Sequence, residues 1–489
     1  MSSPTLEFAP ATSDAALVFG GERIGHDELW ERVARLAHAL AARGIEQGDS
    51  VALLLPNTPD FAVAFLAVAQ LRAVAVPLNP QFKKAELAFC LQDCEARAVL
   101  TDDAGERVCR AIVPRVSPWR EAAQIITGFN ALIESSPALA AGRRSPDEVV
   151  VVQYSSGSSG RPKRVPRTQR QLRAEVEAYA ATIDLGPADT ILGTIPLFHT
   201  YGLGCCLLAA LASGATLALL EAPQPFALAR ERALSLLDRG DVTVLPAVPL
   251  IFRLLAESDA RADLSGVRLC LSAGNALPRS TYDAFRRRFG VPIRQLYGLT
   301  ETGAVSVDVD DDPVPASVGH PIAGVDVVIL DGTGAALPPD RTGEIAVRGP
   351  GVTSGYAGVP DALNRDAFSD GWFRTGDRGR IDAAGRLFLT GRSKLLIDVM
   401  GDKVDPIEVE DVLAVHPKVR EVVVVGVASS VEGEQLIKAV VVADGRCGER
   451  ELIRYCQERL ANYKVPKLVE FRDELPRSSL GRVLRKYLV

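Results

Sequence analysis

The feature that most limits the fold of this chain is a repeated alternation of short apolar runs with stretches whose apolar residues recur at helical spacing. The first part of the chain reads, in order, as a short hairpin at 16–24, a helix at 26–43, a strand at 50–55, a helix at 60–71, a strand at 73–77, a helix at 84–94 and a strand at 98–101. Strands that alternate with helices indicate a largely parallel sheet covered on both faces. The sequence therefore predicts an α/β fold.

The same alternation returns after residue 160, which indicates a second α/β half. Helices are expected at 170–183, 227–239 and 249–258, and strands at 190–195 and 242–245. Beyond about residue 308, short β-rich segments with Gly and Pro turns at 325–330, 343–347 and 386–389 indicate a small barrel-like or distorted sheet.

A compact α+β unit is expected at the C-terminal end, with a helix at 406–415, strands at 419–427 and 436–442, and a helix at 449–460. A chain of 489 residues is also too long for one ordinary domain. The predicted fold class is thus α/β. We expect a large N-terminal domain (1–393) of two doubly wound α/β subdomains plus a small β-barrel-like subdomain, followed by a small α+β C-terminal domain (394–489).

One stretch raises the alternative of a membrane protein, because residues 190–220 contain no Asp, Glu, Lys or Arg and are long enough for a membrane span. Proline and glycine residues interrupt this stretch. They divide it into a strand near 191–195, a helix near 203–212 and a strand near 216–220. A βαβ piece in the core is therefore favoured over a membrane span.

Charge and cysteine content exclude some classes of protein. The formal net charge is −6 and the basic residues are dispersed, so the sequence shows no cluster of basic residues of the kind that binds nucleic acid. The eight cysteines form no C-x-x-C pair, and the first four residues, MSSP, lack the basic and apolar pattern of a secretion signal. We therefore expect reduced, buried thiols in a cytoplasmic protein. The composition does not predict an oligomeric state.

A loop rich in glycine and serine follows the strand-like run at 149–152. Residues 154–163 read YSSGSSGRPK, so we expect this segment to leave regular structure. Free backbone N–H groups, hydroxyls and the Lys163 ammonium suit an anion such as phosphate. The segment is not a Walker A loop, because two residues separate the second glycine from the lysine. Taken alone, it fits a flexible linker equally well.

A set of ordered motifs extends the argument over nearly the whole chain. Besides the Gly/Ser loop they are PLFHTYG at 196–202, LSAGNALP at 271–278, YGLTETG at 297–303, GEI at 343–345, WFRTGD at 372–377, GRSK at 391–394, PIEVE at 406–410 and YKVP at 463–466. In this set the chain resembles the adenylate-forming superfamily, which includes acyl- and aryl-CoA ligases, adenylation domains of peptide synthetases and luciferases. The resemblance implies activation of a small carboxylic acid to acyl-AMP and transfer to a thiol. The implied cofactors are ATP, Mg²⁺ and CoA, or the phosphopantetheine of an acyl carrier protein.

The resemblance also implies candidate ATP ligands. The residues of the loop that would hold the β- and γ-phosphates are Ser155, Ser156, Gly157, Ser158, Ser159, Gly160 and Lys163. Thr300 would contact the α-phosphate, and Glu301 would ligate Mg²⁺, a hard cation that prefers carboxylate oxygen. Without the surrounding motifs, Thr300 and Glu301 would read as a turn with an exposed acid.

Nucleoside and acyl contacts are implied in the same way. The Asp377 carboxylate would accept hydrogen bonds from both ribose hydroxyls, and Arg392 would reach the ribose or a phosphate. His199 would line the acyl site, whereas a lone histidine in an apolar stretch is more often a core residue. The residues that would enclose the adenine are Gly274, Asn275, Ala276 and Tyr297.

The C-terminal domain carries the remaining expectations. Lys394 stands at the family's hinge, about which a mobile small domain would swing between adenylation and thioester formation. Gly401 would leave room for the pantetheine arm of CoA. The family's closing lysine is replaced here by Arg482. Because a planar guanidinium is not equivalent to a compact ammonium, this replacement implies slower adenylation.

Three activities remain open from the sequence. They are an acyl- or aryl-CoA ligase, an enzyme that loads an acyl carrier protein, and a nucleotide-binding homologue whose activity is impaired by Arg482. The segment SAGNALP at 272–278 is closer to the SAGEALP of benzoate-type CoA ligases than to the SGAAPL of coumarate-type enzymes. An aryl or short acyl acid is therefore the first expectation, and a medium-chain fatty acid is the second.

Overall fold

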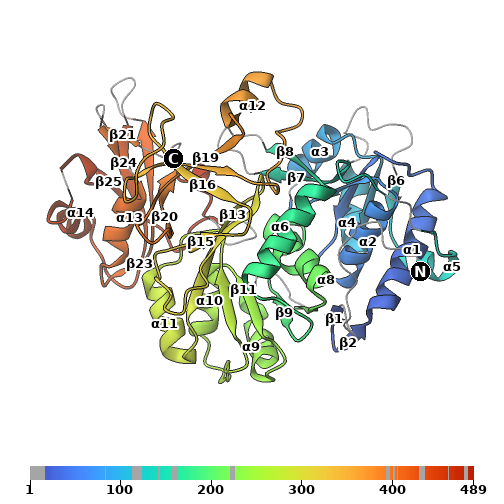
Figure 1. The fold of residues 1–489 in the computed structure, drawn as a ribbon. Coiled ribbons are helices and arrows are strands. Elements are labelled where there is room, and N and C mark those ends of the chain that lie inside the picture. Colours follow the sequence, from blue (N-terminus) through green and yellow to red (C-terminus); the bar gives the residue numbers. More distant parts are fainter. Residues whose placement is uncertain are drawn as a thin grey trace. The chain divides into compact units, whose positions relative to one another are not determined.

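The computed structural model describes residues 17–82, 84–112, 124–140, 144–155, 162–220, 226–392, 397–399, 402–404, 406–428, 435–460, 462–477 and 483–489. The chain divides into two compact units. The first contains Met1–Asp326 and Val347–Phe373, and the second contains Val327–Ala346 and Arg374–Val489. Figure 1 labels many of the elements of both units.

A six-stranded sheet opens the first unit, in the order β6-β5-β3-β4-β7-β8. Its strands are β3 (Ser50–Leu54), β4 (Val74–Pro77), β5 (Ala98–Thr101), β6 (Gln124–Ile126), β7 (Val149–Ser155) and β8 (Lys163–Thr168). Helix α1 (His26–Ala41) precedes them, and the helices between them are α2 (Pro59–Gln70), α3 (Lys84–Asp93), α4 (Asp103–Ile112) and α5 (Phe129–Ser135). Neighbouring strands pair in parallel, except that β8 returns antiparallel to β7. Helix α2 contacts both α1 and the sheet, which explains why every residue from 61 to 70 is buried.

A nine-stranded sheet forms the rest of this unit's core, in the order β15-β14-β13-β12-β11-β9-β10-β1-β2. Its strands are β1 (Leu17–Phe19), β2 (Glu22–Ile24), β9 (Thr190–Gly193), β10 (Thr216–Leu219), β11 (Val244–Ala247), β12 (Leu269–Ser272), β13 (Ile293–Leu299), β14 (Gly303–Val307) and β15 (His320–Pro321). The helical segments of this part are α6 (Gln169–Thr182), α7 (Thr200–Gly202), the π-helix η2 (Leu203–Leu208), α8 (Ala209–Ser213), η3 (Phe226–Leu228), α9 (Arg230–Asp238), α10 (Pro249–Ala256) and α11 (Arg279–Phe289). Parallel pairing runs from β13 through β12, β11, β9 and β10 to β1. The predicted N-terminal hairpin is confirmed, and it lies at the edge of this second sheet.

Helix α6 connects the two sheets of the first unit, because it contacts β8 of the first sheet and β14 of the second (Figure 1). It begins with a capping box. The Gln171 N–H donates to the Thr168 hydroxyl, and the Thr168 N–H donates to the Gln171 side chain. Since Thr168 ends β8 and caps α6, the strand after the Gly/Ser loop and this helix follow each other without a loop.

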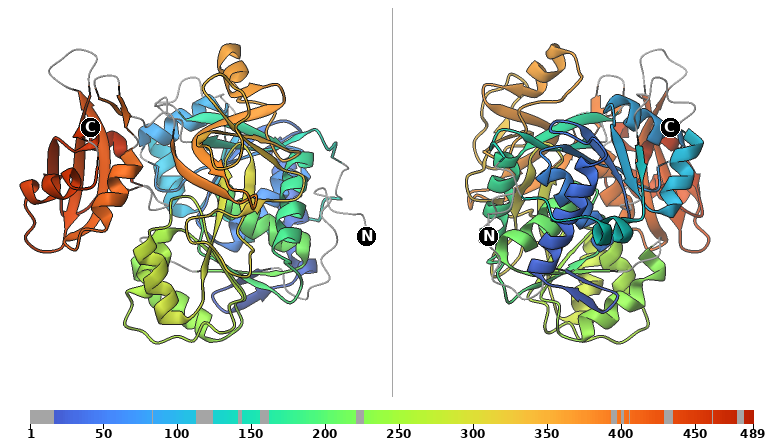
Figure 2. Two further views of the ribbon diagram at one scale, coloured as in Figure 1. Left: turned by 60° about the vertical axis from the view of Figure 1, so that its left-hand side comes forward. Right: turned by 90° about the vertical axis from the view of Figure 1, so that its right-hand side faces the viewer.

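The remaining elements confirm the β-rich segment and the C-terminal α+β unit. A five-stranded sheet has the order β16-β17-β19-β18, with β20 paired to β19, and the C-terminal sheet has the order β23-β24-β25. The elements are β16 (Asp326–Leu330), β17 (Gly343–Arg348), α12 (Asp361–Ala367), β18 (Phe368–Ser369), β19 (Trp372–Ile381), β20 (Leu387–Arg392), β21 (Ile397–Val399), β22 (Asp402–Val404), α13 (Pro406–Ala414), β23 (Val419–Ala428), β24 (Gln435–Ala443), α14 (Glu449–Gln457), η5 (Asn462–Lys464), β25 (Leu468–Phe471) and η6 (Arg485–Tyr487). Helix α13 packs on β23 and α14 on β25. Figure 2 shows this C-terminal part, in orange and red, with helices beside strands. The domain boundary predicted at Lys394 stays a prediction, because this residue lies outside the described ranges.

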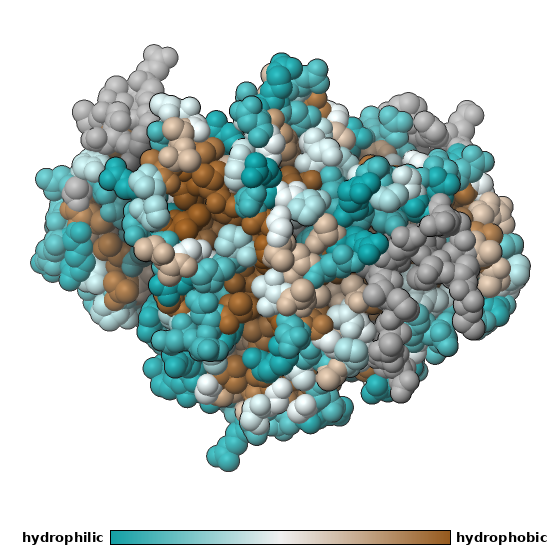
Figure 3. Space-filling model, in the orientation of Figure 1, coloured by the Kyte–Doolittle hydropathy of each residue, from teal (hydrophilic) through white to brown (hydrophobic). Residues whose placement is uncertain are grey.

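The uncharged stretch 190–220 forms a βαβ piece of the core, as the sequence predicts. Strands β9 and β10 pair in parallel, and the helix expected near 203–212 is the π-helix η2 continued by α8. Among the described residues, no helix is both long and apolar enough to cross a membrane. All eight cysteines are free thiols; seven are buried, and Cys447 is partly exposed. On the face in Figure 3, hydrophilic residues are widely spread, with hydrophobic areas between them.

The amino ends of three neighbouring strands are tied together by one charged pair. Asp189 precedes β9, Thr243 precedes β11 and Arg268 precedes β12. Arg268 donates to the two Asp189 carboxylate oxygens over 2.8 and 2.7 Å, and the Thr243 hydroxyl donates to one of them over 2.6 Å. Burial raises the pKa of Asp189, but these hydrogen bonds outweigh burial and hold the pKa below its ordinary value.

We expect Asp189→Asn to lower the free energy of unfolding by about 2 kcal/mol at neutral pH, because Arg268 loses its charged acceptor. The folded-state pKa of Asp189 lies below the unfolded-state value of about 3.9, so its contribution is present above that value and is lost as the pH falls through the folded-state pKa. Urea unfolding of both proteins over a pH series measures the effect. The difference between them should shrink on the acid side, and a difference independent of pH would contradict this assignment.

Candidate active site

The carboxyl ends of the parallel strands bring together three of the predicted site segments. His199 follows β9, residues 274–276 follow β12, and Thr300 and Glu301 follow β13. Strands β9, β11, β12 and β13 are consecutive parallel neighbours, so these three segments leave the sheet along one edge. Ligands in open α/β sheets bind at this edge.

Tyr297 and the segment predicted to enclose adenine both follow the last pair between β12 and β13. This pair is Ser272 with Gln295, and Gly274 and Tyr297 come two residues after it in their own parts of the chain. Tyr297 is buried, whereas Gly274 and Ala276 are exposed. The adenine role of these residues stays a prediction.

Thr300, Glu301 and Thr302 form the three-residue turn of the β13–β14 hairpin. The Leu299 N–H donates to the Thr302 hydroxyl over 3.3 Å, which closes the turn. Gly303 follows with φ of +68°, and a Cβ there would lie 1.8 Å from the Glu175 carboxylate carbon, so the site requires glycine. The Thr300 hydroxyl has no hydrogen-bond partner within the described ranges, which leaves it available to a phosphate oxygen.

Glu301 is a buried side chain, only 7% exposed, and not the exposed acid of an ordinary turn. The Tyr356 hydroxyl donates to its Oε1 over 2.9 Å, and the Thr353 N–H donates to its main-chain oxygen over 2.8 Å. Its Oε2 accepts no hydrogen bond from the described part of the chain, and there no cluster of three or more His, Cys, Asp or Glu forms a metal site by itself. One available carboxylate oxygen fits Mg²⁺, which proteins commonly hold through one or two carboxylates together with substrate phosphates.

The Gly/Ser loop is more regular at its ends than the sequence predicts. The expectation that residues 154–163 lack regular structure is wrong at both ends, because β7 continues through Ser155 and β8 begins at Lys163, where the two residues pair across an antiparallel hairpin. The Lys163 Nζ lies 4.3 Å from the centre of the Tyr356 ring. The loop residues outside the described ranges, whose phosphate role stays a prediction, are Ser156, Gly157, Ser158, Ser159 and Gly160.

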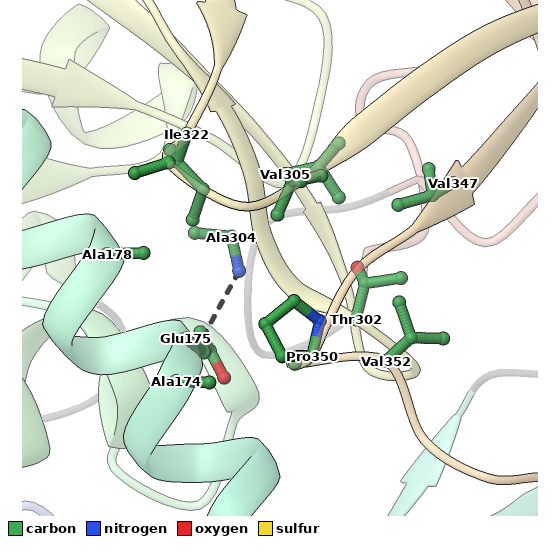
Figure 4. A pocket seen from close by; sticks show the side chains of 13 residues that line it. Ala174, Glu175, Ala178, Thr302, Ala304, Val305, Ile322, Val347, Pro350 and Val352 are labelled. Carbon is green, nitrogen blue, oxygen red and sulfur yellow. Dashed lines mark hydrogen bonds between the residues drawn. The ribbon is translucent and has the colours of Figure 1, made fainter.

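A buried ion pair lies behind the Thr300 turn. Arg167 Nη2 and Glu175 Oε2 are 2.9 Å apart, and the two side chains are 0% and 2% exposed. Arg167 also donates to the Thr300 carbonyl oxygen over 3.4 Å. The Ala304 N–H donates to Glu175 Oε1 over 3.2 Å, as Figure 4 shows. Burial raises the pKa of Glu175, and the charge of Arg167 opposes this rise. The pair therefore ties both ends of the turn to β8 and α6.

A small cavity borders this ion pair (Figure 4). Its walls are mostly apolar and include Ala178, Ile322 and Val347. Glu175, its charged member, already has one oxygen bonded to Arg167 and the other to the Ala304 N–H. The cavity thus lacks the convergent free polar groups that orient a ligand, and we assign it no substrate.

The turn that carries His199 is fixed by a side-chain amide of the other sheet. Gln153, on β7, donates to the Phe198 carbonyl oxygen over 3.2 Å and accepts from the Thr200 hydroxyl over 2.9 Å. These two bonds bracket His199 in the sequence. The His199 Nδ1 accepts from the Tyr201 N–H over 3.2 Å, so a neutral imidazole carries its proton on Nε2. The strand that leads into the Gly/Ser loop therefore also positions this histidine.

The other predicted residues belong to the second unit or lie outside the described ranges. Asp377 is buried on β19 and pairs with Arg392 of β20 across the antiparallel register, so the two predicted nucleoside ligands are neighbours. Lys394, Gly401 and Arg482 lie outside the described ranges, and their roles stay predictions.

Sequence reasoning missed four residues that build this site: Gln153, Arg167, Glu175 and Tyr356. Two of them carry a signal in the sequence. Arg167 shares the inward face of β8 with Val165 at a spacing of two, and Glu175 lies on the apolar face of α6 with Leu172 and Val176. A charge on a predicted core face indicates a buried partner. Gln153 and Tyr356 carry no comparable local signal.

Comparison with known proteins gives two matching family models. One, for the AMP-binding enzyme, matches residues 8–357, and the other, for the AMP-binding enzyme C-terminal domain, matches residues 408–482. Oxalate–CoA ligase of Arabidopsis thaliana is 32% identical over 96% of this chain and 94% of the relative. Feruloyl-CoA synthase of an Amycolatopsis species is 35% identical over 96% of this chain and 94% of the relative. The crystal structure of ATP-bound MatB from Rhodopseudomonas palustris superimposes with a TM-score of 0.91 at 28% identity, covering 100% of this chain and 98% of that one.

We expect Glu175→Leu to lower the free energy of unfolding by about 3–5 kcal/mol, because Arg167 is then a buried charge without its partner. The double variant Arg167→Met with Glu175→Leu should recover part of this loss, since neither charge remains buried. Urea unfolding of the wild type, both single variants and the double variant gives the coupling energy. Losses that simply add would show that the two residues do not act as a pair.

Proposed function

The chain belongs to the AMP-binding enzyme family, and we propose that it activates an aryl or a short- to medium-chain acyl acid with ATP and transfers the acyl group to CoA. The curated relatives are CoA ligases, so the enzyme is an AMP-forming acid–thiol ligase. These relatives act on acids as different as oxalate and ferulate at similar identity. The names of these relatives support CoA as the acceptor, whereas the choice of acid rests on this chain's own residues.

The observation that carries the proposal is that Lys163 and Glu301 both contact the side chain of Tyr356. The Lys163 Nζ lies 4.3 Å from the centre of the Tyr356 ring, and the Glu301 Oε1 accepts from the Tyr356 hydroxyl over 2.9 Å. A cation for phosphate oxygens and a carboxylate for a divalent metal thus lie within the span of one tyrosine. This pairing of charges suits Mg·ATP.

The first half-reaction joins the acid to AMP. A carboxylate oxygen of the acid attacks the α-phosphorus of ATP, and the bond to pyrophosphate breaks. Lys163 would neutralise charge on the phosphates, and the Thr300 hydroxyl would donate to an α-phosphate oxygen. Glu301 would hold Mg²⁺, which when bound neutralises the charge that pyrophosphate carries away. Because the turn is fixed before the substrates bind, these donors need no rearrangement during the reaction.

In the second half-reaction the thiolate sulfur attacks the carbonyl carbon of acyl-AMP, the thioester forms and AMP leaves. His199 would line the acyl group in both steps. Its Nδ1 accepts from the Tyr201 N–H, so a neutral imidazole carries its proton on Nε2.

The segments at the carboxyl edge of the nine-stranded sheet support an uncharged acyl group. Residues 190–208, 244–249 and 269–277 contain no Lys or Arg. None of these segments could supply a cation to a second carboxylate or a sulfonate on the substrate, and an unpaired charge is costly to desolvate. This composition supports an aryl or alkyl acid over a dicarboxylic acid such as oxalate.

The loop after β12 has a backbone conformation that agrees with the benzoate-type pattern. Gly274 adopts φ of +85°, a conformation that residues with a side chain rarely adopt. The backbone therefore requires glycine at the third position of SAGNALP, where benzoate-type enzymes also have it, and the buried Ala273 precedes it. This agreement favours the benzoate-type pattern over SGAAPL.

Pyrophosphate release across a panel of acids tests the proposal. The panel contains benzoate, a hydroxycinnamate, hexanoate, octanoate and oxalate, each with CoA, without CoA, and with a phosphopantetheinylated carrier protein. We expect release with an aryl or medium-chain acid and formation of its CoA thioester. Thioester formed only on the carrier protein would overturn the acceptor assignment, and activity with oxalate alone would overturn the acid assignment.

We expect Glu301→Gln to lower turnover on the order of a hundredfold, because the amide keeps the shape of the side chain but removes the anionic ligand of the metal. The loss should be partly recovered at high Mg²⁺ concentration, since weaker metal binding is its cause. A magnesium titration of pyrophosphate release measures this dependence. Wild-type turnover at every Mg²⁺ concentration would rule out Glu301 as the metal ligand.

A further inference from the structure

The segment from Thr353 to Ala357 bridges two parts of the candidate ATP site through its backbone. The Thr353 N–H donates to the Glu301 carbonyl oxygen over 2.8 Å, and the Thr353 hydroxyl donates to the Pro166 carbonyl oxygen over 2.6 Å. At the other end, the Ala357 N–H donates to the Arg164 carbonyl oxygen over 3.0 Å. The segment is therefore attached both to β8, which begins at Lys163, and to the turn that carries Glu301.

Tyr356, in this segment, is held both at its backbone and at its ring. Asn364, on α12, accepts from the Tyr356 N–H and donates to the Tyr356 carbonyl oxygen, each over 2.9 Å. The ring packs edge-on against Phe368, with centroids 5.4 Å apart. With both backbone groups and the ring fixed, the phenol has little freedom to turn.

The two ends of this side chain contact residues of opposite charge. The hydroxyl donates to Glu301 Oε1 over 2.9 Å, and the ring lies 4.3 Å from Lys163 Nζ. The phenol is the donor in this hydrogen bond, and the carboxylate oxygen is the acceptor. An ammonium over a tyrosine face is attracted by the ring.

We propose that Tyr356 is a positioning residue for Mg·ATP with two separable roles. Its hydroxyl holds Glu301 Oε1 so that Oε2 stays available to the metal, and its ring holds the Lys163 ammonium near the phosphates. Hydrogen bonds to a metal-binding carboxylate commonly decide metal affinity, even though the donor never touches the metal. The inference rests on the proposed function and adds to it the residue that couples the cation to the metal ligand.

Two substitutions separate the roles. Tyr356→Phe removes the hydroxyl and keeps the ring, whereas Tyr356→Leu removes both. Calorimetric titration with ATP at several Mg²⁺ concentrations reports binding without any dependence on turnover. We expect Tyr356→Phe to raise the Mg²⁺ concentration needed for tight binding by about tenfold and to leave ATP affinity at saturating Mg²⁺ unchanged.

Tyr356→Leu should show the same magnesium shift and, in addition, about two- to fivefold weaker ATP binding at saturating Mg²⁺, because Lys163 loses the ring. In a Lys163→Ala background this difference between the Phe and Leu variants should disappear. In a Glu301→Gln background the magnesium shift of Tyr356→Phe should disappear. A tyrosine that only stabilised the fold would not show this selective loss of each effect.

Asp189→Asn provides the control for stability, because it removes hydrogen bonds at the amino ends of the strands, away from the site. It should lower resistance to urea and change neither binding parameter.

If Tyr356→Phe keeps the wild-type magnesium dependence, the hydroxyl role is refuted. If the Phe and Leu variants bind ATP equally in the natural background, the ring role is refuted. Failure of the wild-type protein to bind Mg·ATP refutes the proposed function and this inference together, whereas normal wild-type binding with unchanged variants refutes the inference alone.

Discussion

The ion pair between Arg167 and Glu175 is the interaction on which the candidate site most depends. It joins β8, α6 and the β13–β14 turn, and both side chains are almost completely buried. Two charges removed from water are costly unless each finds several polar partners. Here the Thr300 carbonyl oxygen and the Ala304 N–H supply additional hydrogen bonds, while the buried Arg167 Nε has no partner within the described ranges, so the turn compensates the pair in part. The turn and the pair therefore depend on each other.

The buried Glu175 carboxylate also explains why two neighbouring positions, 204 and 303, require glycine. A Cβ at Gly303 or at Gly204 would meet the Glu175 carboxylate, at 1.8 Å and 2.7 Å from its nearest atom. Small residues around a buried carboxylate let the backbone N–H groups approach it, which a side chain would prevent. The glycine that ends the motif at 297–303 is thus required by packing as well as by the geometry of the turn.

In the nine-stranded sheet, the residues that stabilise the strands and the residues of the candidate site lie at opposite ends of the strands. At the amino ends, Asp189 and Arg268 tie the strands together, and at the carboxyl ends the segments with His199, Gly274 and Glu301 come together. The residues that orient these segments, such as Gln153 and Tyr356, come from other parts of the first unit. A site built from several segments needs such cross-connections, because each segment alone would be free to move by more than catalysis tolerates.

The sequence by itself determined the α/β class, nearly all of the elements from 26 to 101 and from 406 to 460, and the motifs that place the chain among AMP-binding enzymes. These properties are local, because helical and strand periodicity, turn residues and motif spacing each depend on residues close together in the sequence. Only the tertiary structure decided that the N-terminal hairpin joins the second sheet beside β10, that Ser155 and Lys163 pair in a hairpin, and that Arg167, Glu175 and Tyr356 surround Thr300 and Glu301. Glu175 and Ala304 are 129 residues apart in the chain, and Tyr356 and Glu301 are 55 apart. Contacts at such separations depend on which helix and strand faces pack together. A local pattern of residues does not specify these pairs of faces.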